Sequence, residues 1–450
     1  MNHFIPFSKE EQQQMLHKVG VKSVDELFSD IPDSVRLTKP LSISPVLSEP
    51  ELTAYLQTLA NKNIGKQYLC FLGAGAYDHY IPAAVDAIVS RSEFYTAYTP
   101  YQAEASQGTL QTIYEYQSMV CELTGMEVSN ASMYDAATAI AESALMAIRS
   151  TGRKQILVSQ TVHPNYREVL ETYCHTAGIT VQEIPYTNGI TDLNQLAQLV
   201  NQDTAAIIIQ HPNFFGNLEP AYELDSLIHQ YGGLLISSVN PISLGILAPP
   251  NLYHTDITVM EGQSLGNPLN FGGPYLGILA CKKELMRLIP GRIVGMTKDH
   301  EGKPGFVLTM QTREQHIRRQ KAVSNICSNQ ALLALSATVY LSLLGKQGLK
   351  EVAVLNLQKT NYLKQQIAKV PGYNVLWQTQ PGFNEFVVQC PIPAKEVNRK
   401  LLDAGIIGGY PLESQYPELN NCLLFCVTEK RTKTDIDRLI NTLAHFKLQN

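Results

Sequence analysis

The densest group of polar and aromatic side chains lies in TPYQAEASQG, residues 99–108, directly after SEFYTAY. This mixture suits a binding pocket or a protein interface, because its hydroxyl, amide and carboxylate groups need polar partners. A plain surface loop is the alternative, in which Ser106 or Thr109 only caps the following helix. The candidate interface residues are Tyr95, Tyr98, Thr99, Tyr101, Gln102, Glu104, Ser106 and Gln107.

Two His-Pro-Asn segments, at His163 and His211, each follow a predicted strand. Ligands of open α/β sheets bind in the crevice at the carboxyl ends of the strands, so this position favours a role in a site. A histidine beside a proline turn is also commonly a hydrogen-bonded structural residue. The sequence leaves both interpretations open.

Basic side chains gather in TREQHIRRQKAVSN, within a chain whose formal charge is −5. Arg313, Arg318, Arg319 and Lys321 could attract an acidic partner or substrate. The alternative is a solvated helix face on which Glu314 pairs with Arg318 four residues later.

Two other patterns do not predict sites. In the glycine-rich FLGAGAYDH, the third glycine of a dinucleotide loop would fall at Asp78, whose charge would repel a pyrophosphate. Of the eight cysteines, only Cys422 and Cys426 lie close together, and no second ligand pair accompanies them. We therefore expect no nucleotide and no metal, and we interpret the cysteines as reduced thiols.

Composition limits the possible partners and the compartment. A sequence pI of about 6.1 gives no basic footprint for nucleic acid or for an acidic membrane. The apolar run at 331–344 is shorter than the roughly 20 residues of a membrane span, and it predicts a buried helix. The polar N-terminus lacks the apolar stretch of a secretory signal, so we expect a cytoplasmic protein.

The elements that must position these residues are clearest in the middle of the chain. The runs QILVSQ, TVQEIPY, TAAIIIQH and GGLLISSV alternate with helical segments, which predicts a mostly parallel sheet with helices on both faces. The segments DITVMEG and YLGILACK resemble the two strands of a hairpin. They add a seventh or edge strand to the sheet, which should run opposite to the parallel strands. We expect a helical arm at 1–65 that wraps another surface, a large α/β domain at 66–330 and a smaller α+β domain at 331–450.

Four long motifs connect the chain with a known family: TPYQAEASQG, EGQSLGNPLNFGGPYLG, PGRIVGMT and QTREQHIRRQKAVSNICSNQALLA. Over essentially its whole length the chain resembles the glycine cleavage P protein, and more narrowly the first subunit of its two-chain bacterial form. The resemblance implies an aminotransferase-like fold, the pyridoxal-phosphate-dependent fold type I. It also implies decarboxylation of glycine, with transfer of the aminomethyl group to the lipoyl group of the H protein.

The residues that this cofactor needs are not found where the resemblance places them. Such enzymes hold pyridoxal phosphate on a lysine, yet no lysine lies between Lys154 and Lys282, and Ser264 stands about where it is expected. Ser237, Ser238 and Asn240 replace the carboxylate that would keep the pyridine nitrogen protonated. Asp135 brings negative charge to the expected phosphate cup. The degenerate cofactor site then comprises Ser264, Ser237, Asp135 and His163.

Enzymes of this fold build active sites across a two-fold interface, so each subunit completes its neighbour's pocket. The resemblance thus implies an (αβ)2 heterotetramer whose second subunit carries the lysine and the pyridoxal phosphate, while this chain binds no cofactor covalently. Its interface residues in 95–107 would complete the partner's site, with no proton transfer assigned to any of them. The basic residues of 313–321 would contact the H protein.

Two other hypotheses remain open at the level of sequence. The chain could be a self-sufficient pyridoxal-phosphate enzyme that uses an unusual lysine, such as Lys282, Lys298 or Lys321. It could also be a non-catalytic regulatory or scaffolding protein that reuses the fold, because a fold does not determine a function.

Overall fold

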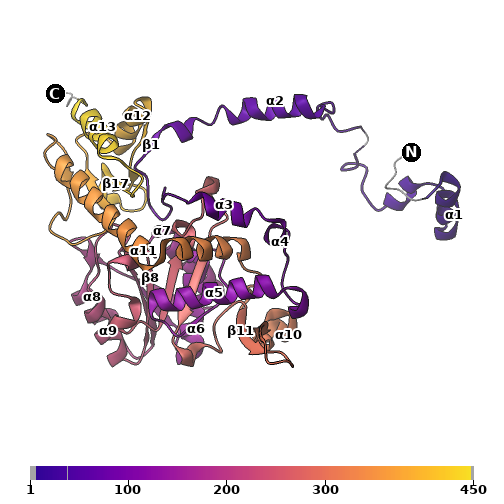
Figure 1. Cartoon of the computed structure of the whole chain (residues 1–450), viewed down its shortest axis with the longest axis horizontal. Helices are drawn as coiled ribbons and strands as arrows, with labels where there is room; N and C mark the ends of the chain where they lie inside the picture. Colours follow the sequence, from indigo (N-terminus) through magenta and orange to yellow (C-terminus); the bar gives the residue numbers. More distant parts are fainter. Residues whose placement is uncertain (1–6, 38, 447–450) are drawn as a thin grey trace. The chain divides into compact units, whose positions relative to one another are not determined.

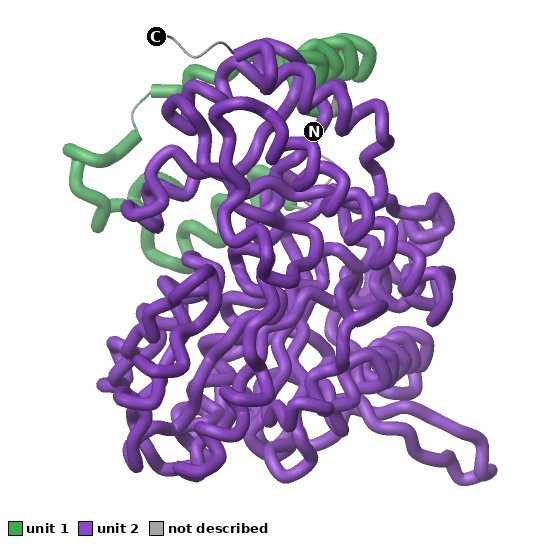
Figure 2. The backbone as a smooth tube through the Cα atoms, turned by 90° about the vertical axis from the view of Figure 1, so that its left-hand side faces the viewer, with its two compact units in different colours: residues 1–66 green, residues 67–450 purple. Residues whose placement is uncertain are grey.

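The computed structural model describes residues 7–37 and 39–446. Its contacts divide the chain into two units, Met1–Lys66 and Gln67–Asn450, which Figure 2 shows in green and purple. Unit 2 contains both the large sheet and the smaller C-terminal one.

Unit 1 contains two locally encoded helices, α1 (Lys9–Val19) and α2 (Glu49–Ala60). The predicted capping box of α2 is present: the Ser48 backbone amide donates to the Glu51 carboxylate over 2.9 Å. Within the described residues neither helix has a buried side chain. Their apolar groups therefore remain available for packing against another surface.

The central sheet of unit 2 has seven strands, in the order β2-β10-β9-β8-β7-β3-β4. The last five of these are parallel to one another, which confirms the predicted β–α–β rhythm. The predicted antiparallel pair is formed by β9 and β10, but the edge strand next to β10 is β2. The strands are β2 (Val128–Ser129), β3 (Gln155–Ser159), β4 (Thr180–Ile184), β7 (Thr204–His211), β8 (Leu234–Val239), β9 (Ile257–Glu261) and β10 (Gly277–Cys281).

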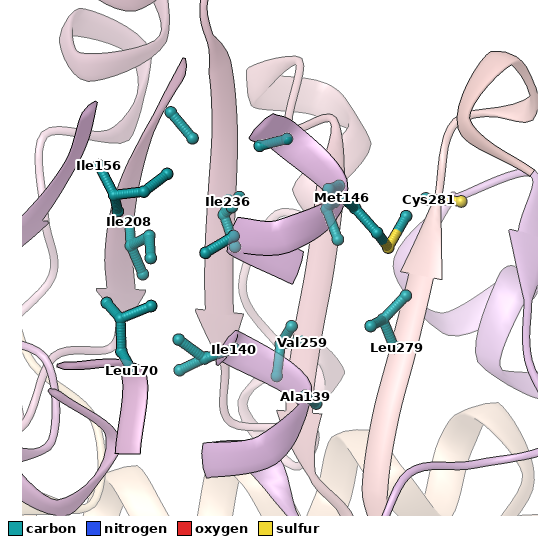
Figure 3. Packing of buried hydrophobic residues seen from close by; sticks show 14 of the residues in the cluster. Ala139, Ile140, Met146, Ile156, Leu170, Ile208, Ile236, Val259, Leu279 and Cys281 are labelled. Atoms are coloured by element: carbon teal, nitrogen blue, oxygen red, sulfur yellow. The ribbon is translucent and has the colours of Figure 1, made fainter. Parts of the chain in front are cut away.

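Helices cover both faces of this sheet (Figure 1). On one face, Ile140 of α6 and Leu170 of α7 pack against strand residues such as Ile208 and Val259 (Figure 3). On the other face, α8 and α9 cover β3, β7 and β8, while α5 and α11 cover β9 and β10. These helices are α5 (Gln107–Thr124), α6 (Ala136–Thr151), α7 (Pro164–Thr176), α8 (Leu193–Leu199), α9 (Ala221–Gln230) and α11 (Ala331–Ile367).

A four-stranded antiparallel sheet, β13-β14-β17-β16, forms the second core of unit 2 together with helices α12 and α13. These elements are β13 (Asn374–Val375), β14 (Glu385–Gln389), β16 (Tyr410–Pro411), β17 (Cys422–Cys426), α12 (Ala394–Asp403) and α13 (Lys433–Ala444). The remaining elements are β1 (Leu69–Cys70), which pairs with β15 (Ile406–Ile407), β5 (Tyr186–Thr187), β6 (Ile190–Thr191), β11 (Ile293–Lys298), β12 (Pro304–Thr309), α3 (Ala83–Val89), α4 (Ser92–Tyr95) and α10 (Gln315–Arg318).

The long helix α11 contributes to both cores, because Gly345 interrupts it with φ 57° and ψ −173°. Tyr340 before the break packs with the large sheet, and Leu363 after it packs with the small one. By length and composition α11 could also span a membrane, but its apolar first half packs in the core, as predicted. The domain boundary at residues 330–331 stays a prediction.

Candidate functional site

A small polar cavity lies at the carboxyl ends of β7, β8 and β9, where the fold places its ligand crevice. It encloses about 30 Å³, room for one or two water molecules. Drug-sized ligands and cofactors occupy pockets of roughly 300–1,000 Å³. The cavity is lined by Gly75, Tyr77, Tyr166, Gln210, Pro212, Asn213, Ser238, Val239, Asn240, Pro241, Glu261, Asn384 and Glu385.

The glycine-rich segment FLGAGAYDH, residues 71–79, contributes to the wall of this cavity. The Gln263 side chain holds it in two directions: it accepts from Tyr77 N over 2.8 Å and donates to Tyr77 O over 3.1 Å. Ala74 N donates to Glu385 Oε1 over 2.7 Å. The segment thus forms one wall of the crevice and is held there by the chain's own polar groups.

Glu385, the first residue of β14 in the small sheet, is 5% exposed and bonds to the same glycine-rich segment. Its second oxygen accepts from the Tyr77 hydroxyl over 2.8 Å. Burial raises the pKa of Glu385 from 4.5 to about 7, against the lowering effect of its two hydrogen-bond donors. Folding therefore favours the protonated carboxyl.

This shift predicts a pH-dependent stability that Glu385→Gln removes. Because the folded-state pKa lies above the unfolded one, the stabilisation is complete below about pH 4.5 and is lost as the pH rises through about 7. Between pH 5 and pH 8 the wild type should lose about 2–3 kcal/mol of unfolding free energy relative to Glu385→Gln.

Urea titrations of both proteins at several pH values measure this difference. The matched control is Glu223→Gln on the exposed face of α9, which should leave the pH dependence of the wild type unchanged. Parallel pH profiles for wild type and Glu385→Gln would show that Glu385 has no such role.

Two acidic side chains bond to the N-terminus of α6, and one of them, Glu261, also lines the cavity. Asp135 is the N-cap, and its Oδ1 accepts from Thr138 N over 2.8 Å. Glu261, the last residue of β9, accepts from Ala136 N over 3.1 Å with its Oε2. Burial raises the pKa of Glu261 to about 8, with a smaller contribution from Asp135. Two of the amides that could bind a phosphate, Ala136 N and Thr138 N, are thus bonded internally.

The predicted Ser264 lies next to this site but does not line the cavity. Its side chain is 2% exposed, and its Oγ has no hydrogen-bond partner among the described residues. Ser237 is also outside the cavity: its Oγ lies 2.8 Å from Thr255 Oγ1. Ser238 lines the cavity instead, because successive residues of a strand point to opposite faces.

The two predicted histidines are hydrogen-bonded neutral groups. Nδ1 of His163 accepts from Asn165 N over 3.2 Å, so its Nε2 donates to Ala74 O over 2.9 Å. Its ring stacks on Tyr166, with 4.5 Å between ring centres. Burial lowers the pKa of His163 and of His211 to about 4. His163 thus supports the glycine-rich segment, without lining the cavity itself.

The polar loop at 95–107 lies away from the cavity, beside the hairpin of β11 and β12 (Figure 1). Its tyrosines are open to solvent, with Tyr98 90% exposed. The side-chain amide of Gln107 fastens the end of the loop to β12, since it donates to Phe306 O over 2.8 Å and accepts from Phe306 N over 2.9 Å. Ser106 is the N-cap of α5 but makes no side-chain capping bond. The other predicted loop residues are Tyr95, Thr99, Tyr101, Gln102 and Glu104, of which Thr99 is half-buried and the others exposed.

The predicted basic patch is smaller than expected, because Arg313 is 7% exposed. Its guanidinium donates to the carbonyl groups of Ile289, Gly291 and Met310, so it fastens the chain and cannot contact a partner. The predicted pairing of Glu314 with Arg318 is absent among the described ion pairs; Glu314 lies near His316 and Arg292 instead. The exposed basic residues of the segment are Arg318, Arg319 and Lys321.

Among the described residues, none that line the cavity is a lysine. Lys282 follows β10 at the opposite end of the sheet, where it pairs with Asp256 over 2.5 Å. Lys298 ends β11, and Lys321 lies in the basic segment, both exposed. The geometry therefore offers no imine-forming amine to the crevice.

These residues do not fit pyridoxal phosphate. The cavity is too small for it, the α6 N-terminus already bonds Asp135 and Glu261, and a phosphate dianion there would lie beside the negatively charged N-cap Asp135. What remains is a small polar crevice and an exposed polar loop on another part of unit 2.

The sequence of this chain matches a known protein family over almost its whole length. The family model of the glycine cleavage system P-protein matches residues 2–443. A probable glycine dehydrogenase (decarboxylating) subunit 1 of Anoxybacillus flavithermus is 53% identical over 447 residues, which cover 99% of each chain.

Solved structures agree with these sequence matches. A glycine decarboxylase (P-protein) in inhibitor-bound form superposes with a TM-score of 0.88 at 42% identity, covering 98% of this chain and 99% of that one. A C-DES mutant with glycine covalently linked to its pyridoxal-phosphate cofactor has a TM-score of 0.61 at 17% identity, over 82% of this chain and 94% of that one. The second likeness shows the fold alone, the pyridoxal-phosphate-dependent fold type I.

Proposed function

The chain belongs to the glycine cleavage system P-protein family, and from this premise we propose that it is the cofactor-free subunit of a two-chain glycine decarboxylase. The second subunit supplies the lysine and the pyridoxal phosphate, and this chain completes the second subunit's active site. One observation carries the proposal: the α6 N-terminus, where the cofactor phosphate would bind, is occupied by Asp135 and Glu261.

The exposed loop at 95–107 is the part of this chain that we assign to the partner's pocket. Gln107 fastens the end of this loop to the hairpin, and the aromatic rings and amides of the loop contribute little to the core of unit 2. Exposed aromatic and polar groups of this kind are typical of a protein interface. Tyr98 and Gln102 are the members that we expect to approach the partner's substrate most closely.

The apolar side chains of α2 support association with a second chain. Leu52, Tyr55, Leu56 and Leu59 follow the i, i+3, i+4, i+7 spacing of one helix face, and each is more than 40% exposed. A helix of this length is marginal alone in water, so a second surface must stabilise it. We propose that this surface belongs to the partner in an (αβ)2 heterotetramer.

The substrate and the carrier follow from the same proposal. Glycine is decarboxylated at the partner's cofactor, and the aminomethyl group passes to the lipoyl group of the H protein. Arg318, Arg319 and Lys321 remain exposed for contact with an acidic carrier, whereas Arg313 is excluded by its burial. We further propose that the complex works in the cytoplasm.

Reconstitution tests the function. We expect glycine-dependent exchange of carbon dioxide, with lipoylated H protein present, from the mixture of this chain and the second subunit, and from neither chain alone. Activity of this chain alone would favour the self-sufficient enzyme. Unchanged activity of the second subunit on addition of this chain would favour the scaffolding protein.

A further inference from the structure

A buried guanidinium connects the polar loop with the rest of unit 2. Arg292 directly precedes β11 and is 4% exposed. Its Nη2 donates to Cys327 O over 2.7 Å and to the Tyr101 hydroxyl over 3.2 Å. The guanidinium carbon also lies 5.5 Å from the centre of the Tyr101 ring, a cation–π distance. Tyr101 is thus held both by its ring and by its hydroxyl.

The same guanidinium reaches the basic segment. Arg292 Nε lies 4.0 Å from Glu314 Oε2, and that oxygen lies 3.5 Å from Nδ1 of His316. The His316 ring meets the Tyr101 ring edge-on, with 6.0 Å between their centres. We call Tyr101, Arg292, Glu314 and His316 the Arg292 cluster. It joins the two segments that the sequence singled out separately.

The Arg292 cluster is incomplete in this chain. Arg292 Nε and Glu314 Oε1 are buried without a hydrogen-bond partner among the described residues. Such groups are rare in folded proteins, and each needs an explanation. The neighbouring Arg313 shows the contrast, because three backbone carbonyls satisfy its guanidinium as a purely structural residue. Arg292 instead lies beneath the 53% exposed Tyr101.

We propose that Arg292 is a positioning residue, which fixes Tyr101 at the surface that completes the partner's active site. This inference rests on the proposed function. The planar guanidinium is needed because it lies under the ring while its two Nη groups donate to Tyr101, Cys327 and Asn329, a geometry that the compact ammonium of a lysine does not reproduce. Association with the second subunit is expected to complete the polar contacts of the Arg292 cluster.

A double-mutant cycle in the reconstituted two-chain enzyme tests the proposal. Arg292→Gln should lower kcat for carbon dioxide exchange at least about tenfold, as a misplaced positioning group does. Arg292→Lys should recover part of the loss, because an ammonium keeps the cation–π contact. In an enzyme that already carries Tyr101→Ala, adding Arg292→Gln should lower kcat by less than about a further twofold, because Arg292 acts through Tyr101. The control is Arg287→Gln, an exposed arginine outside the cluster, expected to have no effect.

Full activity of Arg292→Gln, or losses that multiply in the double variant, would overturn the proposal. If Arg292→Gln does not fold, Tyr101→Ala decides, because Tyr101 is exposed: a fully active Tyr101→Ala enzyme contradicts the proposal, and a tenfold loss supports it. If the proposed function itself is wrong, this chain will be active alone or will not change the activity of the second subunit. That result differs from an active two-chain enzyme in which only the Arg292 variants behave unexpectedly.

Discussion

Replacing Tyr98 by alanine should lower glycine decarboxylation by the assembled two-chain enzyme about 100-fold. Tyr98 is 90% exposed in this chain, so the change removes no packing and should alter the unfolding free energy by no more than about 0.5 kcal/mol. In the complex the same ring would line the partner's pocket, where loss of a positioning contact costs about two orders of magnitude in rate. Steady-state exchange of carbon dioxide measures the effect.

Tyr222→Ala is the matched control for this prediction. Tyr222 is also an exposed tyrosine, 53% open, but it lies on α9, away from the polar loop (Figure 1). Its replacement should leave the rate unchanged. Gln102→Ala, like Tyr98→Ala, should lower the rate of glycine decarboxylation. If both loop variants retain full glycine turnover, the loop does not complete the partner's site.

Restoring a lysine at position 264 should not restore a cofactor site. Ser264 is 2% exposed and its hydroxyl has no hydrogen-bond partner among the described residues, so Ser264→Lys buries an ammonium at a position that offers the side chain no bond. We expect a loss of about 3–5 kcal/mol in unfolding free energy, the usual cost of an uncompensated buried charge. Added pyridoxal phosphate should give no internal-aldimine absorbance, because Asp135 and Glu261 still occupy the α6 N-terminus.

Ser264→Ala separates the effect of the charge from that of the lost hydroxyl. The Ser264 hydroxyl has no partner among the described residues, so its removal should cost less than about 1 kcal/mol. Urea unfolding of the two variants measures the difference. A stable Ser264→Lys chain that turns yellow with pyridoxal phosphate would show that the crevice still accepts the cofactor.

Much of the fold could be predicted because it follows from local patterns. Apolar runs with short helical segments between them indicated the parallel part of the sheet, and Ser48 with Glu51 indicated the start of α2. The edge position of β2 could not be predicted. That strand has only two residues, and its place next to β10 depends on contacts between segments 150 residues apart.

The site was less predictable, because its decisive contacts are tertiary. Asp135 was found from the sequence, whereas Glu261 was missed: its only signal was a carboxylate at the end of a strand. The sequence did not show which residues of β8 face the cavity. Ser237 was assigned to the site, but Ser238 lines the cavity, because neighbouring strand residues face opposite ways. Arg313 looked like a surface charge because the sequence does not show which carbonyl groups surround it.

Reduction with borohydride tests the central claim most directly. The assembled enzyme is treated with borohydride, which fixes any pyridoxal phosphate that is held as an imine, and the mass of each chain is then measured. We predict that the second subunit gains one cofactor and that this chain keeps its unmodified mass. A cofactor adduct on a lysine of this chain would contradict the account.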